Sequence, residues 1–206
     1  MGVWLCDSCR AGLKPVLPPV CPLCGRPTDR PQICSHCRLA PLQIDGIRSV
    51  LYFDGALRTA IHALKYRNAR HLADPLGEMM GSYWQAHHIP ADVIVPVPLH
   101  PSRERARGYN QSTLLAYKLG EITGLPVREN LLARIRATAP QVELGAEARR
   151  ENVRGAFYCA PVSATGLHVL LVDDVCTTGS TLEACSQALR AGGARSVWAL
   201  TLARAL

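Results

Sequence analysis

The hydrophobic pattern of the chain changes near residue 46, beyond which apolar runs of strand length alternate with apolar residues at helical spacing. The segment 168–172 is an apolar run of the kind that a strand buried on both faces of a sheet requires. A second apolar run, at 92–98, is closed by prolines, and looser alternation predicts strands over 46–53 and 196–202. These four segments are the predicted strands of the sheet.

Helices are predicted between the strands, where apolar residues recur on one face. The pattern indicates helices over 54–67, 111–123 and 180–191. A further helix over 72–86 is expected to be interrupted by Pro75. Strands that alternate with helices predict an α/β fold with a mostly parallel, doubly wound sheet.

The first 45 residues follow a different pattern, dominated by cysteine and proline. Six of the nine cysteines form three Cys-x-x-Cys pairs here: Cys6/Cys9, Cys21/Cys24 and Cys34/Cys37. Two residues between thiolates let a tight turn direct both sulfurs at one tetrahedral ion. The second and third pairs therefore predict a structural Zn²⁺ site formed by Cys21, Cys24, Cys34 and Cys37. We expect a zinc module over 1–45 and a larger domain over 46–206.

The pair Cys6 and Cys9 has no defined partner in the sequence. It is compatible with zinc binding together with Cys21 and Cys24, and equally with a second ion that uses ligands from elsewhere. The remaining cysteines are expected to be small buried apolar residues: Cys159, Cys176 and Cys185.

Composition narrows the classes of protein further. The net charge is +7, and 20 of the 23 basic residues are arginine, whose planar fork of donors suits phosphate and carboxylate groups. No apolar run approaches the ~18–20 residues of a membrane span, and no signal peptide pattern precedes the cysteines. A cytoplasmic protein with a polyanionic partner is the expectation.

The strongest functional signal lies in residues 170–182. A buried strand delivers Asp173 and Asp174 to its carboxyl end, where ligands of open α/β sheets bind. The small residues 177–181 follow and open onto a helix, so their hydroxyl and N–H groups form a cradle for one phosphate. Because carboxylates repel phosphate at short range, we expect the acid pair to face the hydroxyls of a sugar or a Mg²⁺ ion.

This segment resembles the phosphoribosyl-pyrophosphate (PRPP) signature of type I phosphoribosyltransferases. Almost the whole chain is similar to the ComF family, which joins a cysteine zinc module to a phosphoribosyltransferase domain and is associated with DNA uptake in natural transformation. Besides the signature, the similar blocks are 21–26 with Cys34 and Cys37, 64–66, 95–100 with Arg103, 107–111, then Arg134, Arg136, Thr138 and Gln141, and finally Arg150, Asn152 and 155–157.

The resemblance implies roles for individual residues. Asp173 and Asp174 would hold the ribose hydroxyls of PRPP, which binds with Mg²⁺. The pyrophosphate would be bound by Arg103 and Arg107, and the 5-phosphate by Thr177, Thr178, Gly179, Ser180 and Thr181. Arginines spaced two apart, as at 103–107, cannot share one helical face, so a loop or extended segment is expected there.

Three functions are compatible with these features. The first is phosphoribosyl transfer from PRPP with release of pyrophosphate, although Thr177 stands where some relatives carry a general base, so the proton acceptor is not identified. The second is PRPP binding without turnover. The third is the handling of single-stranded DNA by the zinc module and the arginine-rich residues 132–155, which also suit a mobile arm over the substrate.

The resemblance adds two further expectations. Competence DNA-translocation proteins are candidate partners, and a homodimer is common in the fold. The family pattern also has a Cys-x-x-Cys pair before the one matched by Cys6 and Cys9. Its absence is compatible with an incomplete first zinc site or with a truncated start.

Overall fold

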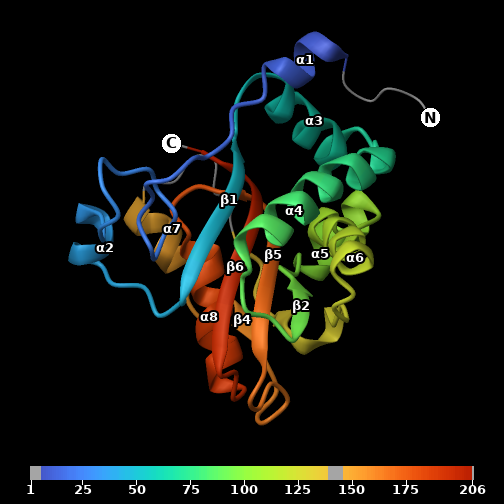
Figure 1. The fold of residues 1–206 in the computed structure, drawn as a ribbon. Helices are drawn as coiled ribbons and strands as arrows, with labels where there is room; N and C mark the ends of the chain where they lie inside the picture. Colours follow the sequence, from blue (N-terminus) through green and yellow to red (C-terminus); the bar gives the residue numbers. More distant parts are fainter. Residues whose placement is uncertain (1–5, 139–145, 206) are drawn as a thin grey trace.

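A four-stranded parallel sheet forms the centre of the computed structural model, which describes residues 6–138 and 146–205 (Figure 1). The strand order is β1-β6-β5-β2, and every neighbouring pair in this sheet is parallel. The four strands are β1 (Gly46–Tyr52), β2 (Val93–Pro96), β5 (His168–Cys176) and β6 (Ser196–Arg204). All four predicted strands are confirmed.

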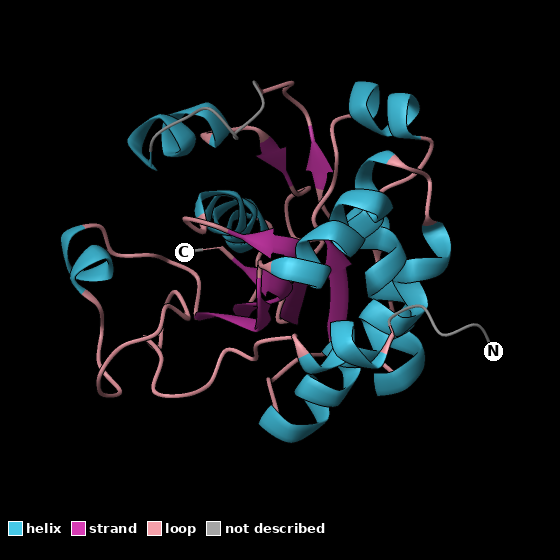
Figure 2. Cartoon of the chain, turned by 90° about the horizontal axis from the view of Figure 1, so that it is seen from above, coloured by secondary structure: helices cyan, strands magenta, loops and turns pink. Residues whose placement is uncertain are grey.

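Helices cover both faces of this sheet, which confirms the doubly wound arrangement (Figure 2). Alternate residues of β5 contribute to two apolar cores: Val169 and Leu171 to one, Leu170 and Val172 to the other. One core is completed by α8 (Ser180–Ala191), and the other by α3 (Gly55–Tyr66), α4 (Ala73–His87) and α6 (Gln111–Thr123).

The helix expected to be interrupted by Pro75 is continuous. The 3-10 turn η1 (Arg70–Leu72) leads into α4, and Pro75 is the third residue of α4. N–H groups in the first turn of a helix have no acceptor within the helix, so a proline there removes no hydrogen bond. The predicted interruption was therefore wrong.

The expected loop around Arg103 is also wrong, because residues Pro101–Arg107 form the short helix α5. Pro101 occupies the first turn, the His100 side chain accepts a hydrogen bond from the N–H of Ser102, and Gly108 ends the helix with φ +83°. In a helix, Arg103 and Arg107 share a face and Arg105 does not. The structure agrees, since Arg105 is exposed whereas Arg103 and Arg107 are half-buried.

The cysteine segment contains α1 (Asp7–Ala11) and α2 (Ser35–Leu39) and lies against the β1 edge of the sheet (Figure 1). The Ile47 N–H donates to the Leu23 carbonyl at 2.7 Å. A Cβ on Gly25, whose φ is +68°, would lie 2.4 Å from the Ile47 carbonyl oxygen, so only glycine permits this approach. Backbone contacts thus join the two predicted domains, and the boundary at residue 45 stays a prediction.

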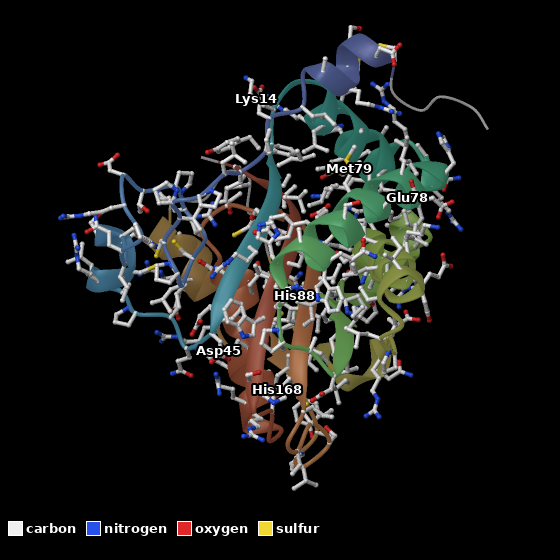
Figure 3. All side chains as sticks on the ribbon, viewed as in Figure 1. Lys14, Asp45, Glu78, Met79, His88 and His168 are labelled. Carbon is white, nitrogen blue, oxygen red and sulfur yellow. The ribbon has the colours of Figure 1, made fainter. Side chains whose placement is uncertain are left out.

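Asp45 fixes the start of β1 at this junction (Figure 3). Its Oδ2 lies 2.6 Å from Arg190 Nη2 and accepts a hydrogen bond from the Val197 N–H at 2.7 Å. One carboxylate therefore ties the linker after the cysteine segment to both α8 and β6.

Residues 129–158 form an excursion from the sheet. After η2 (Glu129–Leu131), β3 (Ala133–Arg134) pairs antiparallel with β4 (Phe157–Tyr158), and α7 (Ala146–Val153) packs on α8. Residues 139–145, including Gln141 of the similar blocks, lie outside the described residues, so the mobile arm predicted over 132–155 stays a prediction. Among the described residues, no helix has the length and apolar character needed to cross a membrane.

Candidate functional site

The acid pair lies at the carboxyl end of β5, where three elements hold it. The Ser112 hydroxyl donates to Asp173 Oδ1 at 2.7 Å, and the Asp174 N–H donates to the same oxygen at 2.9 Å. Asp174 is 3% exposed, and its Oδ2 lies 2.7 Å from Lys65 Nζ in the last turn of α3. The sequence placed both acids at this strand end correctly.

Capping interactions explain why Ser112 and Lys65 point at the acid pair. The Asn110 side chain caps α6 by accepting from the Ser112 N–H at 3.0 Å and donates to the Val97 carbonyl at 3.0 Å, which fixes the start of α6 beside β2. The Tyr109 hydroxyl donates to the Leu64 carbonyl and so anchors the end of α3. Both helix ends therefore converge on the end of β5.

Burial and charge shift the proton equilibria of this cluster. Burial and the adjacent Asp174 raise the pKa of Asp173 to about 7, against the opposing effects of Lys65 and Ser112. Burial alone would lower the pKa of Lys65, but the attraction and hydrogen bond of Asp174 and the charge of Asp173 outweigh it, so this pKa is raised. Lys65 is thus a cation at neutral pH and offsets part of the acid pair's charge.

Lys65 is a site residue that the sequence reasoning missed. It lies within the similar block 64–66, but no role was assigned to it. Its partner Asp174 comes from a distant part of the chain, so no local pattern could reveal the ion pair. A buried acid that is only 4% exposed in its side chain does, however, require a counter-charge or proton.

The predicted cradle forms a compact turn that leads into α8. The Thr178 and Ser180 hydroxyl oxygens lie 2.8 Å apart, and the Ser180 N–H donates to Thr178 Oγ1 at 3.3 Å. Gly179 has φ +83°, which favours glycine, and a Cβ there would lie 2.9 Å from Ile47 Cδ1, so the end of that side chain would have to shift. The turn therefore places hydroxyl groups at the positive end of a 12-residue helix.

The expected pyrophosphate arginines occupy different surroundings. Arg103 Nη2 donates to the Thr138 carbonyl at 2.6 Å. Arg107 donates to Gln111, and its guanidinium lies 5.4 Å from the centre of the Tyr66 ring. Both belong to α5, which follows the carboxyl end of β2. Since β2 and β5 are parallel, α5 lies on the same side of the sheet as the acid pair at the carboxyl end of β5.

Arg134 joins this basic group, although the sequence assigned it no role. It is 8% exposed, donates to the Thr138 hydroxyl and lies 5.2 Å from the centre of the Phe157 ring. Burial and the charge of Arg103 lower its pKa, and its Nε has no hydrogen bond among the described residues. Two arginines converge on Thr138 with no described carboxylate in salt-bridge range, which suits an anion.

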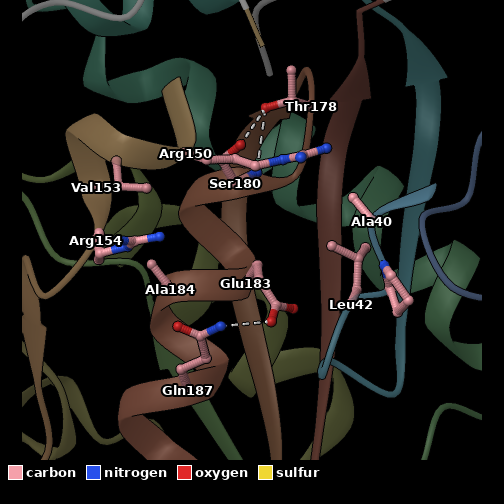
Figure 4. A pocket seen from close by; sticks show the side chains of 11 residues that line it. Ala40, Leu42, Arg150, Val153, Arg154, Thr178, Ser180, Glu183, Ala184 and Gln187 are labelled. Carbon is pink, nitrogen blue, oxygen red and sulfur yellow. Dashed lines mark hydrogen bonds between the residues drawn. The ribbon is translucent and has the colours of Figure 1, made fainter. Parts of the chain in front are cut away.

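A pocket of about 270 Å³ lies beside the cradle (Figure 4). Thr178 and Ser180 line one side of it, Arg150 of α7 and Arg154, which follows α7, line another, and the linker residue Leu42 closes it. Arg150 Nη2 also lies 3.0 Å from His36 Nε2, in α2 of the cysteine segment. Arg150 thus lies between the cradle and the cysteine segment.

The metal-binding cysteines form one buried cluster. The sulfur atoms of Cys21, Cys24, Cys34 and Cys37 all lie within 4.8 Å of one another. The Cys34 N–H donates to Cys21 Sγ at 3.4 Å, the kind of hydrogen bond that stabilises a thiolate ligand. Four thiolates at these separations fit tetrahedral Zn²⁺, with Zn–S distances of about 2.3 Å. The chemistry of the donors supports the predicted structural zinc site.

Cys6 and Cys9 do not join this cluster. They lie at the start of α1, where Cys6 is exposed and its sulfur contacts the Ser8 hydroxyl oxygen. The structure groups Cys21 and Cys24 with Cys34 and Cys37, and metal binding by Cys6 and Cys9 stays a prediction. The other cysteines are buried as expected: Cys159, Cys176 and Cys185.

Known proteins share both halves of this arrangement. Residues 125–206 match the phosphoribosyl transferase domain family, and residues 2–38 match the double zinc ribbon domain family. DNA utilization protein YhgH of Salmonella typhimurium is 33% identical to this chain, with 98% of the chain and 91% of the relative covered. Competence protein F of Haemophilus influenzae is 33% identical, with 98% and 90% covered. Competence protein ComFC of Bacillus subtilis is 29% identical, with 97% and 84% covered.

The parallel sheet and its carboxyl-end site define a type I phosphoribosyltransferase-like domain that carries a zinc ribbon. Relatives of 33% identity extend over almost the full length of this chain and of their own. The chain belongs to the ComF family.

Proposed function

We propose that this protein binds PRPP and Mg²⁺ at the carboxyl end of β5, in support of DNA uptake or the use of imported nucleotides. The observation that carries the proposal is the order of groups there: a partly neutralised acid pair, in which Asp174 is buried, is followed by a turn of small hydroxyl-bearing residues at a helix start. The names of the relatives, which refer to competence and DNA utilization, support the biological role.

Each part of PRPP has chemically matched residues in this proposal. Asp173 and Asp174 accept hydrogen bonds from the ribose hydroxyls, and residues 177–181 bind the 5-phosphate. Arg103 and Arg107 face the pyrophosphate, and Arg134 adds a third guanidinium. Arginine donors stabilise the negative charge that concentrates on pyrophosphate as it leaves. Mg²⁺, held by the carboxylates, would neutralise part of the same charge.

Phosphoribosyl transfer to an acceptor is the reaction that such a site supports. The pocket beside the cradle, with Arg150 and Arg154, has room for part of an acceptor. The described residues of the cradle offer hydroxyl groups rather than a carboxylate as a proton acceptor. Transfer would then depend on how readily the N–H group of the acceptor loses its proton.

The proposal is tested by titrating the protein with PRPP, ribose 5-phosphate and pyrophosphate, each with Mg²⁺, in a calorimeter. PRPP should bind more tightly than either fragment, by at least about tenfold, because it engages both the cradle and the arginines. Equal affinity for PRPP and pyrophosphate would show general anion binding and would contradict the proposal. A screen for pyrophosphate release with candidate bases then tests turnover.

Single-stranded DNA is the second candidate ligand. Exposed arginines occur on the zinc ribbon and on α7, including Arg30, Arg38 and Arg150. Such an interface would bind the phosphate backbone, so its affinity should fall steeply as salt increases. A cytoplasmic location, contact with competence DNA-translocation proteins and a homodimer would accompany this role. Binding that is insensitive to salt would contradict it.

A further inference from the structure

A fully buried arginine lies between the cysteine cluster and the cradle. Arg204, the last residue of β6, is 1% exposed. Burying a guanidinium is unfavourable unless an opposite charge lies near it. No carboxylate of the described residues lies within salt-bridge distance of Arg204, and its Nε has no hydrogen bond there. Among the described residues, a counter-charge for Arg204 has to come from a group other than a carboxylate.

The polar contacts of Arg204 lead to the cysteine cluster on one side and to the cradle on the other. Its Nη1 donates to the Cys24 carbonyl at 2.6 Å and to Cys176 Sγ at 3.1 Å. Cys24 belongs to the four-cysteine cluster, whereas Cys176 ends β5 and directly precedes Thr177. One guanidinium nitrogen thus contacts both segments.

The metal site lies beside Arg204 and is a source of negative charge. Burial raises the pKa of Cys176 to about 11, so this cysteine is a neutral thiol near pH 7. Four thiolates around one Zn²⁺ ion, in contrast, carry a net charge of about −2. The cysteine cluster therefore provides what Arg204 lacks.

A second contact reinforces the connection. The Ile47 N–H donates to the Leu23 carbonyl, between two metal-binding cysteines, while its Cδ1 packs where Gly179 of the cradle has no side chain. The Ala205 N–H also donates to the Cys176 carbonyl at 2.9 Å, which fixes the end of β5 to the residue after Arg204. The cradle is thus supported from the side of the zinc ribbon.

We infer that Arg204 is a positioning residue that couples the zinc site to the phosphate cradle. The zinc thiolates stabilise the buried guanidinium, and the guanidinium holds Cys176 and hence the start of the 177–181 turn. Loss of zinc therefore loosens the cradle, although the metal does not contact the ligand. The inference rests on the proposed function only in taking 177–181 as a phosphate site.

The test compares Arg204→Met with Arg204→Lys and with a control, Arg195→Met, which alters an exposed arginine just before β6. Two readouts need no PRPP: the rate of zinc release to a colorimetric chelator, and amide hydrogen exchange over 176–181. Arg204→Met should release zinc at least about tenfold faster and exchange faster at the cradle, as loss of a charge-assisted contact predicts. The amides of α4 and the control should be unchanged.

Arg204→Lys separates charge from geometry. The ammonium group keeps the positive charge but cannot present the planar fork, so zinc release should stay within about threefold of wild type while the cradle still exchanges faster. Wild-type zinc release and cradle exchange in Arg204→Met would overturn the inference. A uniform rise in exchange that includes α4 would also overturn it, because that result indicates general destabilisation.

If Arg204→Met does not fold, Cys176→Ala tests the contact between Arg204 and the cradle with all four metal ligands intact. Zinc release should be unchanged and exchange at 177–181 faster; unchanged exchange would contradict the inference. PRPP affinity forms a third readout and should fall at least about tenfold in Arg204→Met. If the wild type does not bind PRPP, the proposed function fails, and the coupling is still decided by zinc release and exchange.

Discussion

Lys65 shows how a single side chain makes the acid pair possible. Two adjacent carboxylates at the end of a buried strand repel each other, and Asp174 is almost fully buried. Lys65, at 2.7 Å, supplies the compensating charge, while the Ser112 hydroxyl stabilises Asp173. The acids were predictable from their place in the sequence, but their partners come from α3 and α6 and could not be found from local pattern.

Lys65→Met should destabilise the protein by about 2 kcal/mol. Removing one partner leaves Asp174 buried and unpaired, which costs about 3–5 kcal/mol in fully buried pairs. The value is smaller here because the Lys65 side chain is 22% exposed. Lys118→Met is the control: its partner Glu121 is exposed, so a much smaller change in the free energy of unfolding is expected. Urea denaturation measures both, and equal effects would contradict this role.

The raised pKa of Asp173 predicts a pH effect on stability. The unfolded group has its ordinary pKa of 3.8 and the folded group one of about 7, so between these values the folded state binds more protons. The contribution of Asp173 to the free energy of unfolding is therefore present at low pH and is lost as pH rises from about 4 to about 7.

Asp173→Asn should remove that loss, since the amide keeps an oxygen acceptor for Ser112 but cannot ionise. The free energy of unfolding of the variant relative to wild type, without Mg²⁺, should rise by at least about 1 kcal/mol between pH 5 and pH 8. A constant difference across this range would mean that Asp173 titrates as an ordinary aspartate.

At the scale of elements, the strands and the helices with an apolar face were predictable, and the short helix α5 was not. The strands and α3, α6 and α8 have strong apolar patterns, and Asp54 caps α3 as its sequence position indicates. The helix α5 has no apolar face, so spacing alone predicted a loop. Its ends are fixed instead by Pro101, the His100 side chain and Gly108.

Gly179→Ala should weaken the cradle more than a positive φ alone explains. The backbone penalty at φ +83° is about 1–2 kcal/mol, and the added Cβ also meets Ile47 at 2.9 Å. Gly124→Ala, at φ +74° with no atom within 4 Å of the added Cβ, isolates the backbone penalty. Thermal denaturation should show a larger loss for Gly179→Ala, and inorganic phosphate should bind more weakly only in that variant. Equal losses of thermal stability in the two variants would show that the contact with Ile47 adds no penalty.

At the scale of the whole molecule, the zinc ribbon packs directly against the sheet through backbone contacts and is not merely tethered to it by a linker. The cysteine spacing predicted the four metal ligands, but it contains no information on how the zinc ribbon packs against the sheet. Docking depends on the approach of Gly25 to Ile47, on Asp45 and on Arg204, contacts between segments far apart in the chain. Arg134 was missed for the same reason: its burial identifies it as a site residue, and that burial depends on contacts between distant segments.

The central claim is that the acid pair and the cradle form a PRPP site, and calorimetric titration of Asp173→Asn/Asp174→Asn tests it most directly. Wild type and the exposed control Asp74→Asn should bind PRPP with Mg²⁺, and the double variant should bind at least about a hundredfold more weakly, because two charged acceptors are lost. Single-stranded DNA, as a second titrant, should bind all three proteins alike. PRPP binding of wild-type strength in a folded double variant would contradict the account.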